Sequence, residues 1–170
     1  MMTNYYEKVK LFIDMNPHLT IPQTPATDEM ITHIEETLNL TLKGEYLQLI
    51  RHWGTLLLYC SRNDRYHGIY RFNDGNSVRL IYSVIDYTMS CRKTGIDHHF
   101  IAFVSIEGDE YLVLNPQIDG DQEVFRWNYF EQKFEGKISE SLFQLIWQDI
   151  EECVIPFAKK DGKPVNLEGL

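Results

Sequence analysis

The sequence is poor in cysteine, and the three cysteines it has are far apart. Cys60, Cys91 and Cys153 form no Cys-x-x-Cys pair and no Cys/His spacing typical of zinc ligands. An odd number of cysteines cannot pair completely in disulfides. The sequence therefore predicts neither a zinc site nor a disulfide framework, and the cysteines are expected to be reduced and packed in or near the core.

Long hydrophobic runs are also missing. The longest apolar run, LLLYC, is far too short to cross a bilayer, which takes about 20 apolar residues. The N-terminal segment MMTNYYEKVKLFIDM mixes acidic and basic residues with its apolar ones, unlike a secretory signal peptide. We therefore expect a soluble, cytoplasmic protein with no membrane partner.

No cluster of Lys and Arg is large enough to form a phosphate-binding face. The 170 residues include 25 acidic and 16 basic side chains, for a net charge of −9. Direct binding of nucleic acid needs a basic surface, so this balance argues against it. The same charge favours a basic protein partner, because opposite charges speed encounter. A surface that only keeps the protein soluble is the simpler interpretation.

Motifs of common catalytic sites are absent as well. The sequence contains no GxSxG turn, no Walker loop and no GxGxxG loop. As a nucleophile, Cys60 or Cys91 would need His52 or His67 as its base. Neither cysteine is expected at a helix N-terminus, where a thiolate would be stabilised. These absences predict that the protein is not an enzyme.

The segment Asp97-His98-His99 is the only cluster typical of metal or acid–base chemistry. Neighbouring residues of a strand point to opposite faces, so the two histidines cannot bind one ion together. A metal site would need a third ligand, and the sequence does not identify one. We interpret the segment as a solvated turn with an ordinary, partly buried histidine, and we predict no metal and no cofactor.

Apolar residues recur at helical spacing in five segments and at strand spacing in five others. Helices are expected over 6–13, 27–38, 46–53 and 77–95 and from Ser139 onward, and strands over 55–60, 67–72, 99–106, 110–115 and 123–128. The proline-rich segment 16–27 reads as a loop. Thr27 is expected to cap the second helix and Gly54 to end the third with a positive φ. This order predicts one α+β domain.

Apolar stripes on two of these helices predict which side chains are buried. In the fourth helix the stripe consists of Val78, Ile81, Tyr82, Ile85 and Met89. In the last helix it consists of Leu142, Phe143, Ile146, Trp147 and Ile150. The tail 159–170 has no periodicity and is expected to be mobile unless it docks.

Seven carboxylates lie between Thr94 and Phe125 with no Lys or Arg among them: Asp97, Glu107, Asp109, Glu110, Asp119, Asp121 and Glu123. Aspartate is common in turns for its own reasons, but surfaces usually mix both signs. The segment DGDQE also lacks the spacing of a calcium loop. Two interpretations stay open, which are ordinary acidic turns and an electronegative ridge that binds a basic partner.

The hypothetical binding ridge consists of Glu107, Asp109, Glu110, Asp119, Asp121 and Glu123, with Trp127 and Tyr129 nearby. Strand geometry places Phe125 and Trp127 on one face and Val124 and Arg126 on the other. Trp127 can anchor a partner only if its face is open, because binding energy concentrates in aromatic side chains that the partner desolvates.

Several segments together resemble the SUKH superfamily of cell-wall-assembly-regulator and killer-toxin-resistance domains. The stretch ATDEMITHIEETLNLTLKGEYLQLIRHWG is similar to the family's opening motif, with Ile34-Glu35, then Glu45-Tyr46, then Gly54. IYSVIDYT, FIAFVSIEGDEYLVLN, EVFRWN and SESLFQLI follow in the family's order, so the resemblance runs from about Thr27 to Ile150. Leu42-Lys43 replaces the usual Leu-Pro, and Trp53-Gly54-Thr55 replaces the commoner Asn-Gly-Gly.

The resemblance implies an α+β fold with a twisted, largely antiparallel sheet packed against helices, and a role without catalysis. It divides the chain into an N-terminal helix and loop at 1–26, the SUKH-like domain at 27–158 and a tail at 159–170. The motif residues Glu35, Tyr46, Trp53 and Gly54 read as structural, although Glu35 could also contact a partner.

Bacterial members of the family are typically immunity proteins that neutralise a toxin, often a nuclease or deaminase. The leading hypothesis is therefore an immunity protein with a basic cognate toxin as its partner. A regulatory scaffold with no toxin partner is the alternative, and an enzyme built around Asp97, His98 and His99 is a third.

Overall fold

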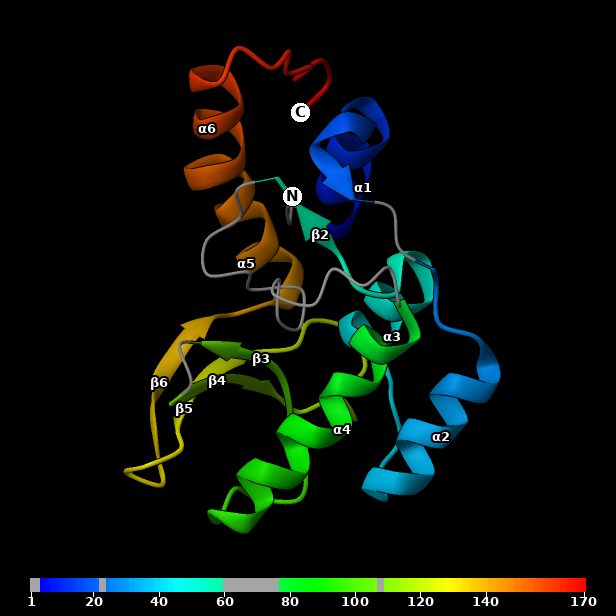
Figure 1. Ribbon diagram of the computed structural model, residues 1–170, viewed down its shortest axis with the longest axis vertical. Helices are drawn as coiled ribbons and strands as arrows, with labels where there is room; N and C mark the ends of the chain where they lie inside the picture. The colour runs from blue at the N-terminus through cyan, green and yellow to red at the C-terminus, as the bar shows by residue number, and fades with distance from the viewer. Residues whose placement is uncertain (1–3, 22–23, 60–76, 107–108) are drawn as a thin grey trace.

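The computed structural model describes residues 4–21, 24–59, 77–106 and 109–170. Some features expected from the sequence therefore lie outside the described residues. They are the strand over 67–72 and the residues Cys60, His67 and Glu107. Within them the chain has an α+β fold, in which helices pack on both sides of one antiparallel sheet (Figure 1).

The helices follow the apolar periodicity of the sequence. They are α1 Tyr5–Met15, α2 Asp28–Leu38, α3 Gly44–Trp53, α4 Ser77–Lys93, α5 Leu142–Asp149 and α6 Ile155–Lys160. Thr27 caps α2 as predicted, since its hydroxyl accepts from the backbone N–H of Met30 at 3.3 Å. Gly54 ends α3 with a φ of 69°, also as predicted, and its N–H donates to the carbonyl of Ile50.

The main sheet has the order β3-β4-β5-β6, with every neighbouring pair antiparallel. Its strands are β3 Ile101–Ile106, β4 Glu110–Leu114, β5 Val124–Asn128 and β6 Lys133–Ser139. The sequence did not predict β6. A smaller sheet pairs β1 Thr20–Ile21 with β2 Leu57–Leu58. The proline-rich segment, which was expected to be a loop, therefore contains a short strand, and the 3₁₀ turn η1, Pro17–Leu19, precedes that strand.

Both faces of the main sheet are covered. One face contributes Leu112, Leu114 and Val124 to the large core that α1, α2, α3 and α5 share. The other face carries Ala102, Val113 and Trp127, which form a smaller core with Tyr87 and Cys91 of α4. The sheet is therefore sandwiched, and a strand residue can be buried on either side of it.

The buried face of α4 differs from the predicted stripe. Val84, Tyr87, Thr88 and Cys91 are buried, whereas Met89 is 42 % exposed. Tyr82 and Ile85 are half-buried beside the large core, and the Tyr82 ring lies 5.1 Å from the ring of His33 on α2. The prediction was wrong for Met89 because α4 packs on β3 along one side and on α2 along another.

The C-terminal helix begins later than predicted. The chain stays in β6 through Ser139, and Ser141 caps α5 by accepting from the N–H of Gln144 at 3.2 Å. The five residues predicted to be buried in this helix are indeed buried, Leu142, Phe143, Ile146, Trp147 and Ile150. A π turn, η4 Ile150–Val154, joins α5 to α6 just before Pro156, which lacks the N–H that an α-helical turn needs.

The tail docks against α1. The fully buried Asn16 forms two hydrogen bonds with the backbone of Asn166, at 2.8 and 2.7 Å. His18 also bonds the carbonyl of Pro164 at 2.7 Å. The tail therefore lies beside the end of α1, on the side of the molecule away from the main sheet (Figure 1).

Candidate interaction surface

The loop between β4 and β5, residues 115–123, is fixed on the start of α3 by Gln122. This side chain is fully buried, and its amide nitrogen donates to the carbonyls of Lys43 and Ile118, both at 2.9 Å. Its oxygen accepts from the N–H of Tyr46 at 2.8 Å and so caps α3, for which Lys43 provides no side-chain cap. Three hydrogen bonds of one buried side chain therefore join the loop to itself and to α3.

Gly44 permits this close approach. It has a φ of 54°, and a Cβ atom at this position would lie 2.5 Å from the carbonyl oxygen of Ile118 and 2.6 Å from the side-chain nitrogen of Gln122. Only glycine tolerates both the backbone conformation and the contact. The first residue of α3 therefore sets the position of the acidic loop.

Glu45 joins the same loop to the start of α5. Its carboxylate, in a residue only 5 % exposed, accepts from the N–H of Gln122 at 2.8 Å and from the N–H of Leu142 at 2.7 Å. It also accepts from the Ser141 hydroxyl and the Phe143 N–H. Burial raises the pKa of Glu45, while these hydrogen bonds act in the opposite direction. The carboxylate is a structural cap placed where the helix dipole favours an anion.

A surface pocket of about 680 Å³ opens beside Glu45. Its walls come from the first turn of α1, from α3, from the β4–β5 loop and from the β6–α5 junction. Glu7, Asp121 and Glu140 are exposed at this pocket, and none of the described residues that line it is basic. The pocket is therefore acidic, with Tyr5, Tyr6 and Phe143 providing apolar wall.

The carboxylates of the predicted ridge lie at two opposite ends of the sheet. Glu110 pairs with Asn128, so the β3–β4 and β5–β6 turns share one end, together with Asp109. Asp119, Asp121 and Glu123 belong to the β4–β5 loop at the other end. At about 3.4 Å per residue, β4 separates the two groups by roughly 15 Å. The structure thus shows two acidic groups rather than one ridge.

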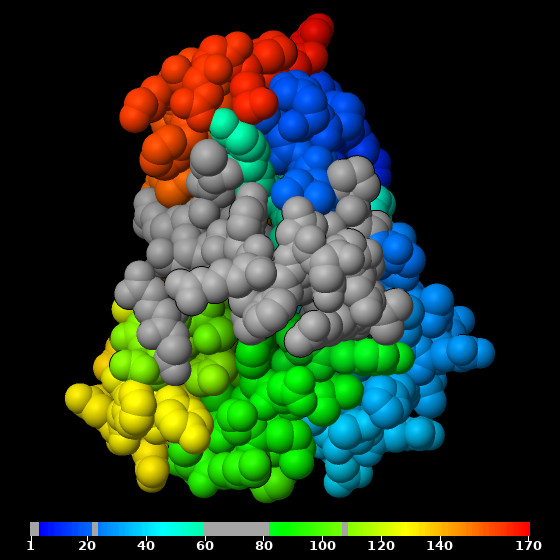
Figure 2. Space-filling model, in the orientation of Figure 1, coloured from blue at the N-terminus to red at the C-terminus, as the bar shows by residue number. Residues whose placement is uncertain are grey.

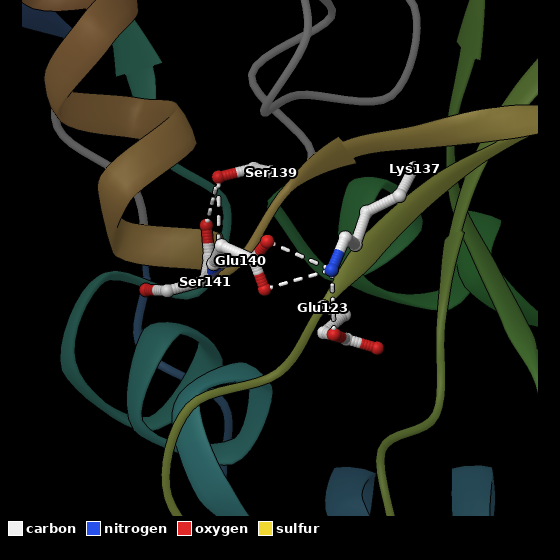
Figure 3. Close-up of polar contacts among 5 residues, drawn as sticks. All are labelled: Glu123, Lys137, Ser139, Glu140 and Ser141. Atoms are coloured by element: carbon white, nitrogen blue, oxygen red, sulfur yellow. Dashed lines mark hydrogen bonds and ion pairs between the residues drawn. The ribbon is translucent and has the colours of Figure 1, made fainter.

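Basic residues from other parts of the chain approach most of these carboxylates. Lys137 lies between Glu123 and Glu140, with its nitrogen 2.9 and 2.7 Å from their oxygens (Figure 3). Lys43 is 3.7 Å from Asp119, and Arg126 is 3.4 Å from Glu110. Such exposed pairs contribute about 0–1 kcal/mol each, so they reduce the local charge more than they stabilise the fold.

Trp127 is not available as an anchor. It is 3 % exposed, in the small core under α4, and its indole N–H donates to Thr94 Oγ1 at 3.4 Å. Phe125 and Trp127 do share one face of the sheet, as expected from strand alternation, but α4 covers that face. Tyr129 is half-buried, and its N–H donates to the carbonyl of Asp109 at 2.8 Å.

Two aromatic residues that sequence reasoning missed are exposed next to Tyr129. Phe130 in the β5–β6 turn is 70 % exposed, and Phe134 at the start of β6 is 41 % exposed. In Figure 2 this turn projects from the lower left of the molecule. The sequence signal was present in WNYFEQKF, where aromatic residues stand among polar ones at a turn. Because β6 was not predicted, the turn was not recognised.

The Asp97-His98-His99 segment forms an exposed turn, so the expectation that one of its histidines is partly buried was wrong. The Asp97 carboxylate accepts from the N–H of His99 at 2.8 Å and also contacts the His99 ring, and these bonds lower the pKa of Asp97. The carbonyl of His98 accepts from Arg92 at 3.0 Å. Among the described residues, no group of three or more His, Cys, Asp or Glu side chains is placed to hold a metal ion.

Cys91 lacks the environment of a reactive thiol. It is fully buried, and burial raises its pKa to about 12, so the thiolate form is disfavoured at neutral pH.

A family model described as SUKH_5, SMI1-KNR4 cell-wall, matches residues 5–151. The chain belongs to the SUKH superfamily. The match begins earlier than the resemblance read from the sequence and includes α1. A search of curated proteins gave no match. SUKH domains are generally non-catalytic immunity proteins, and at this level the chain is an immunity or SMI1-KNR4-like protein.

The SUKH motif residues make contacts inside the domain. Glu35 accepts from the N–H of Leu42 at 2.7 Å and so fixes the turn between α2 and α3. Tyr46 is buried in the large core. The ring of Trp53 packs between those of Tyr6 and Phe143, with centroids at 5.9 and 6.2 Å.

Over the described part of the chain, no helix of this SUKH domain has the length and apolar character that crossing a membrane requires.

Proposed function

We propose that the chain is an immunity protein that binds and neutralises a cognate toxin domain with a basic surface. The observation that carries the proposal is the firm placement of the acidic β4–β5 loop. Gly44 and Gln122 hold this loop against α3, so Asp119 and Asp121 are presented from a fixed backbone. A preorganised charged loop loses little conformational entropy when it binds.

A basic nuclease-type toxin fits this surface best. An enzyme that cleaves nucleic acid must attract phosphates, so its active site is surrounded by Lys and Arg. An inhibitor that presents carboxylates where the substrate's phosphates would lie gains both affinity and association rate. The net charge of −9 and the acidic pocket beside Glu45 support a partner of this kind.

The test is a protection and binding experiment with the toxin domain encoded next to this gene. Co-expression should protect cells from that domain, and the two purified proteins should form a complex of fixed stoichiometry. A neighbouring housekeeping operon, with no toxin gene and no protection, would favour the regulatory scaffold instead.

Charge reversal at each end of the sheet separately would then locate the contact. Asp109→Lys with Glu110→Lys changes one end, and Asp119→Lys with Asp121→Lys changes the other. The variant at the contacting end should associate more slowly at low salt and show a flatter salt dependence.

Glu36→Lys with Glu168→Lys is the matched control, because both residues are exposed, lie in α2 and the C-terminal tail rather than in the turns of the sheet, and change the net charge by the same amount. If neither end variant associates more slowly than this control, the acidic loops are not the binding surface.

A further inference from the structure

The β5–β6 turn carries Phe130, the most exposed of the large hydrophobic side chains among the described residues. Burial of a Phe ring stabilises a fold, and at 70 % exposure Phe130 gains little of that stabilisation. Phe134 is also exposed on its outer side, while its inner side packs on Trp127 with ring centroids 5.0 Å apart. Folding of this chain alone therefore gives no reason for a Phe at position 130.

The turn that presents these rings is ordered by hydrogen bonds. The N–H of Tyr129 donates to the carbonyl of Asp109, and the N–H of Glu131 donates to the side chain of Asn128 at 2.9 Å. The ring of Tyr129 packs edge-on against that of Phe130, with centroids 5.7 Å apart. Rigid aromatic side chains on a fixed backbone bind with little loss of entropy, as interface anchors do.

Carboxylates outnumber bases at this end of the sheet. The carboxylates are those of Asp109, Glu110, Glu131 and Glu135, and the bases are Arg126 and Lys133. Glu110 and Glu135 lie close enough to share a hydrogen bond. Burial raises the pKa of Glu110, and the neighbouring Glu135 raises it further. Arg126 pairs with Glu110 and Lys133 pairs with Glu131, and the carboxylates that exceed these bases in number attract a cation to this end of the sheet.

We call Tyr129, Phe130 and Phe134, with the adjacent Asp109 and Glu131, the hairpin surface. We propose that an arginine-bearing basic loop of the toxin binds the hairpin surface. A guanidinium group fits both of its parts, because it stacks on an aromatic face and pairs with a carboxylate at the same time. This inference rests on the proposed function and adds to it a second contact, at the end of the sheet opposite the β4–β5 loop.

A second copy of the chain is a poorer occupant. Each copy carries a net charge of −9, and a symmetric contact would place the same carboxylates opposite each other. Sedimentation of the protein alone at micromolar concentration tests this point. A dimer that Phe130→Ala dissociates would overturn the inference.

The decisive variant is Phe130→Ala, compared with Phe157→Ala. Both remove an exposed Phe ring, at 70 % and 43 % exposure, and they do so toward opposite ends of the molecule (Figure 1). Phe130→Ala should weaken toxin binding at least about tenfold through faster dissociation, while Phe157→Ala should leave it unchanged. Equal dissociation constants for wild type and Phe130→Ala would overturn the inference and leave the proposed function intact.

A peptide probe tests the same surface without the toxin. In an amide NMR titration, acetyl-Arg-Gly-Arg-amide should shift the signals of 129–135 and Asp109, and acetyl-Lys-Gly-Lys-amide should shift them less. Phe130→Ala should abolish the difference between the two peptides. Shifts confined to the β4–β5 loop, or spread evenly over all acidic residues, would overturn the inference. If no toxin complex forms at all, the proposed function fails, and this titration still decides whether the hairpin surface binds arginine.

Discussion

At the scale of single residues, Glu45 shows how one carboxylate connects three segments. Its two oxygens receive four donors, from Gln122 in the β4–β5 loop and from Ser141, Leu142 and Phe143 at the start of α5. It belongs to the acidic-Tyr pair of the SUKH motif, which explains why the motif has an acid here. The carboxylate fixes both the acidic loop and the helix behind it.

Glu45→Gln should therefore destabilise the fold by about 2–4 kcal/mol, because the amide NH₂ that replaces one oxygen would face backbone N–H donors. Urea denaturation measures this difference. Glu7→Gln at the same pocket is the control, since Glu7 is exposed. Equal stability of the two variants would contradict the capping role of Glu45.

A second prediction at this scale concerns Glu110 and Glu135, two neighbouring carboxylates near the β5–β6 turn. The pKa of Glu110 is raised by burial first and then by Glu135, while the hydrogen bond from Asn128 lowers the pKa of Glu135. Glu135→Gln removes the adjacent negative charge, so the pKa of Glu110 should fall towards its ordinary value. A carboxyl ¹³C NMR titration measures it. Glu131→Gln, which removes an exposed carboxylate paired with Lys133, should change it less.

At the scale of elements, the contact between the β4–β5 loop and α3 positions the acidic end of the sheet. The backbone of the loop touches Gly44 directly, and the N–H of Lys43 donates to the carbonyl of Pro116 at 2.7 Å. The loop can keep its place only while the first turn of α3 has no side chain at position 44.

Gly44→Ala should cost more stability than Gly95→Ala. Both glycines have a positive φ, so both variants incur backbone strain of about 1 kcal/mol. At Gly44 the new methyl group would also lie 2.5 Å from a backbone oxygen, whereas at Gly95 nothing lies within 4 Å. Thermal unfolding measures the difference. Equal melting temperatures for the two variants would contradict the close contact between the β4–β5 loop and Gly44.

At the scale of the whole molecule, function is expected to depend on surface charge and exposed aromatic rings rather than on a catalytic group. The histidine pair tests this distinction. His98→Ala with His99→Ala should leave protection against the toxin intact, since both side chains are exposed and lie in a turn bonded within itself. Loss of protection in a variant that still folds would revive the metal or enzyme hypothesis.

The sequence alone determined the features that depend on near neighbours along the chain. The caps at Thr27 and Gly54 and the core face of α5 were predictable because a helical turn brings together residues three and four apart. The SUKH resemblance was visible for the same reason, since its motif residues lie in these local elements.

Only the tertiary structure decided which side chains remain exposed. β6 escaped prediction because five of its seven residues are exposed at the sheet edge, so burial imposes no clear alternation on its sequence. The acidic residues are consecutive acids in the sequence, but β4 separates them into two groups at opposite ends of the sheet. Lys43 and Lys137 approach the group in the β4–β5 loop from distant segments. Trp127 is buried because it lies in β5, where α4 covers it in the small core, whereas Phe130 follows the strand in the β5–β6 turn and is exposed. That coverage depends on contacts between residues far apart in the chain, which local pattern does not encode.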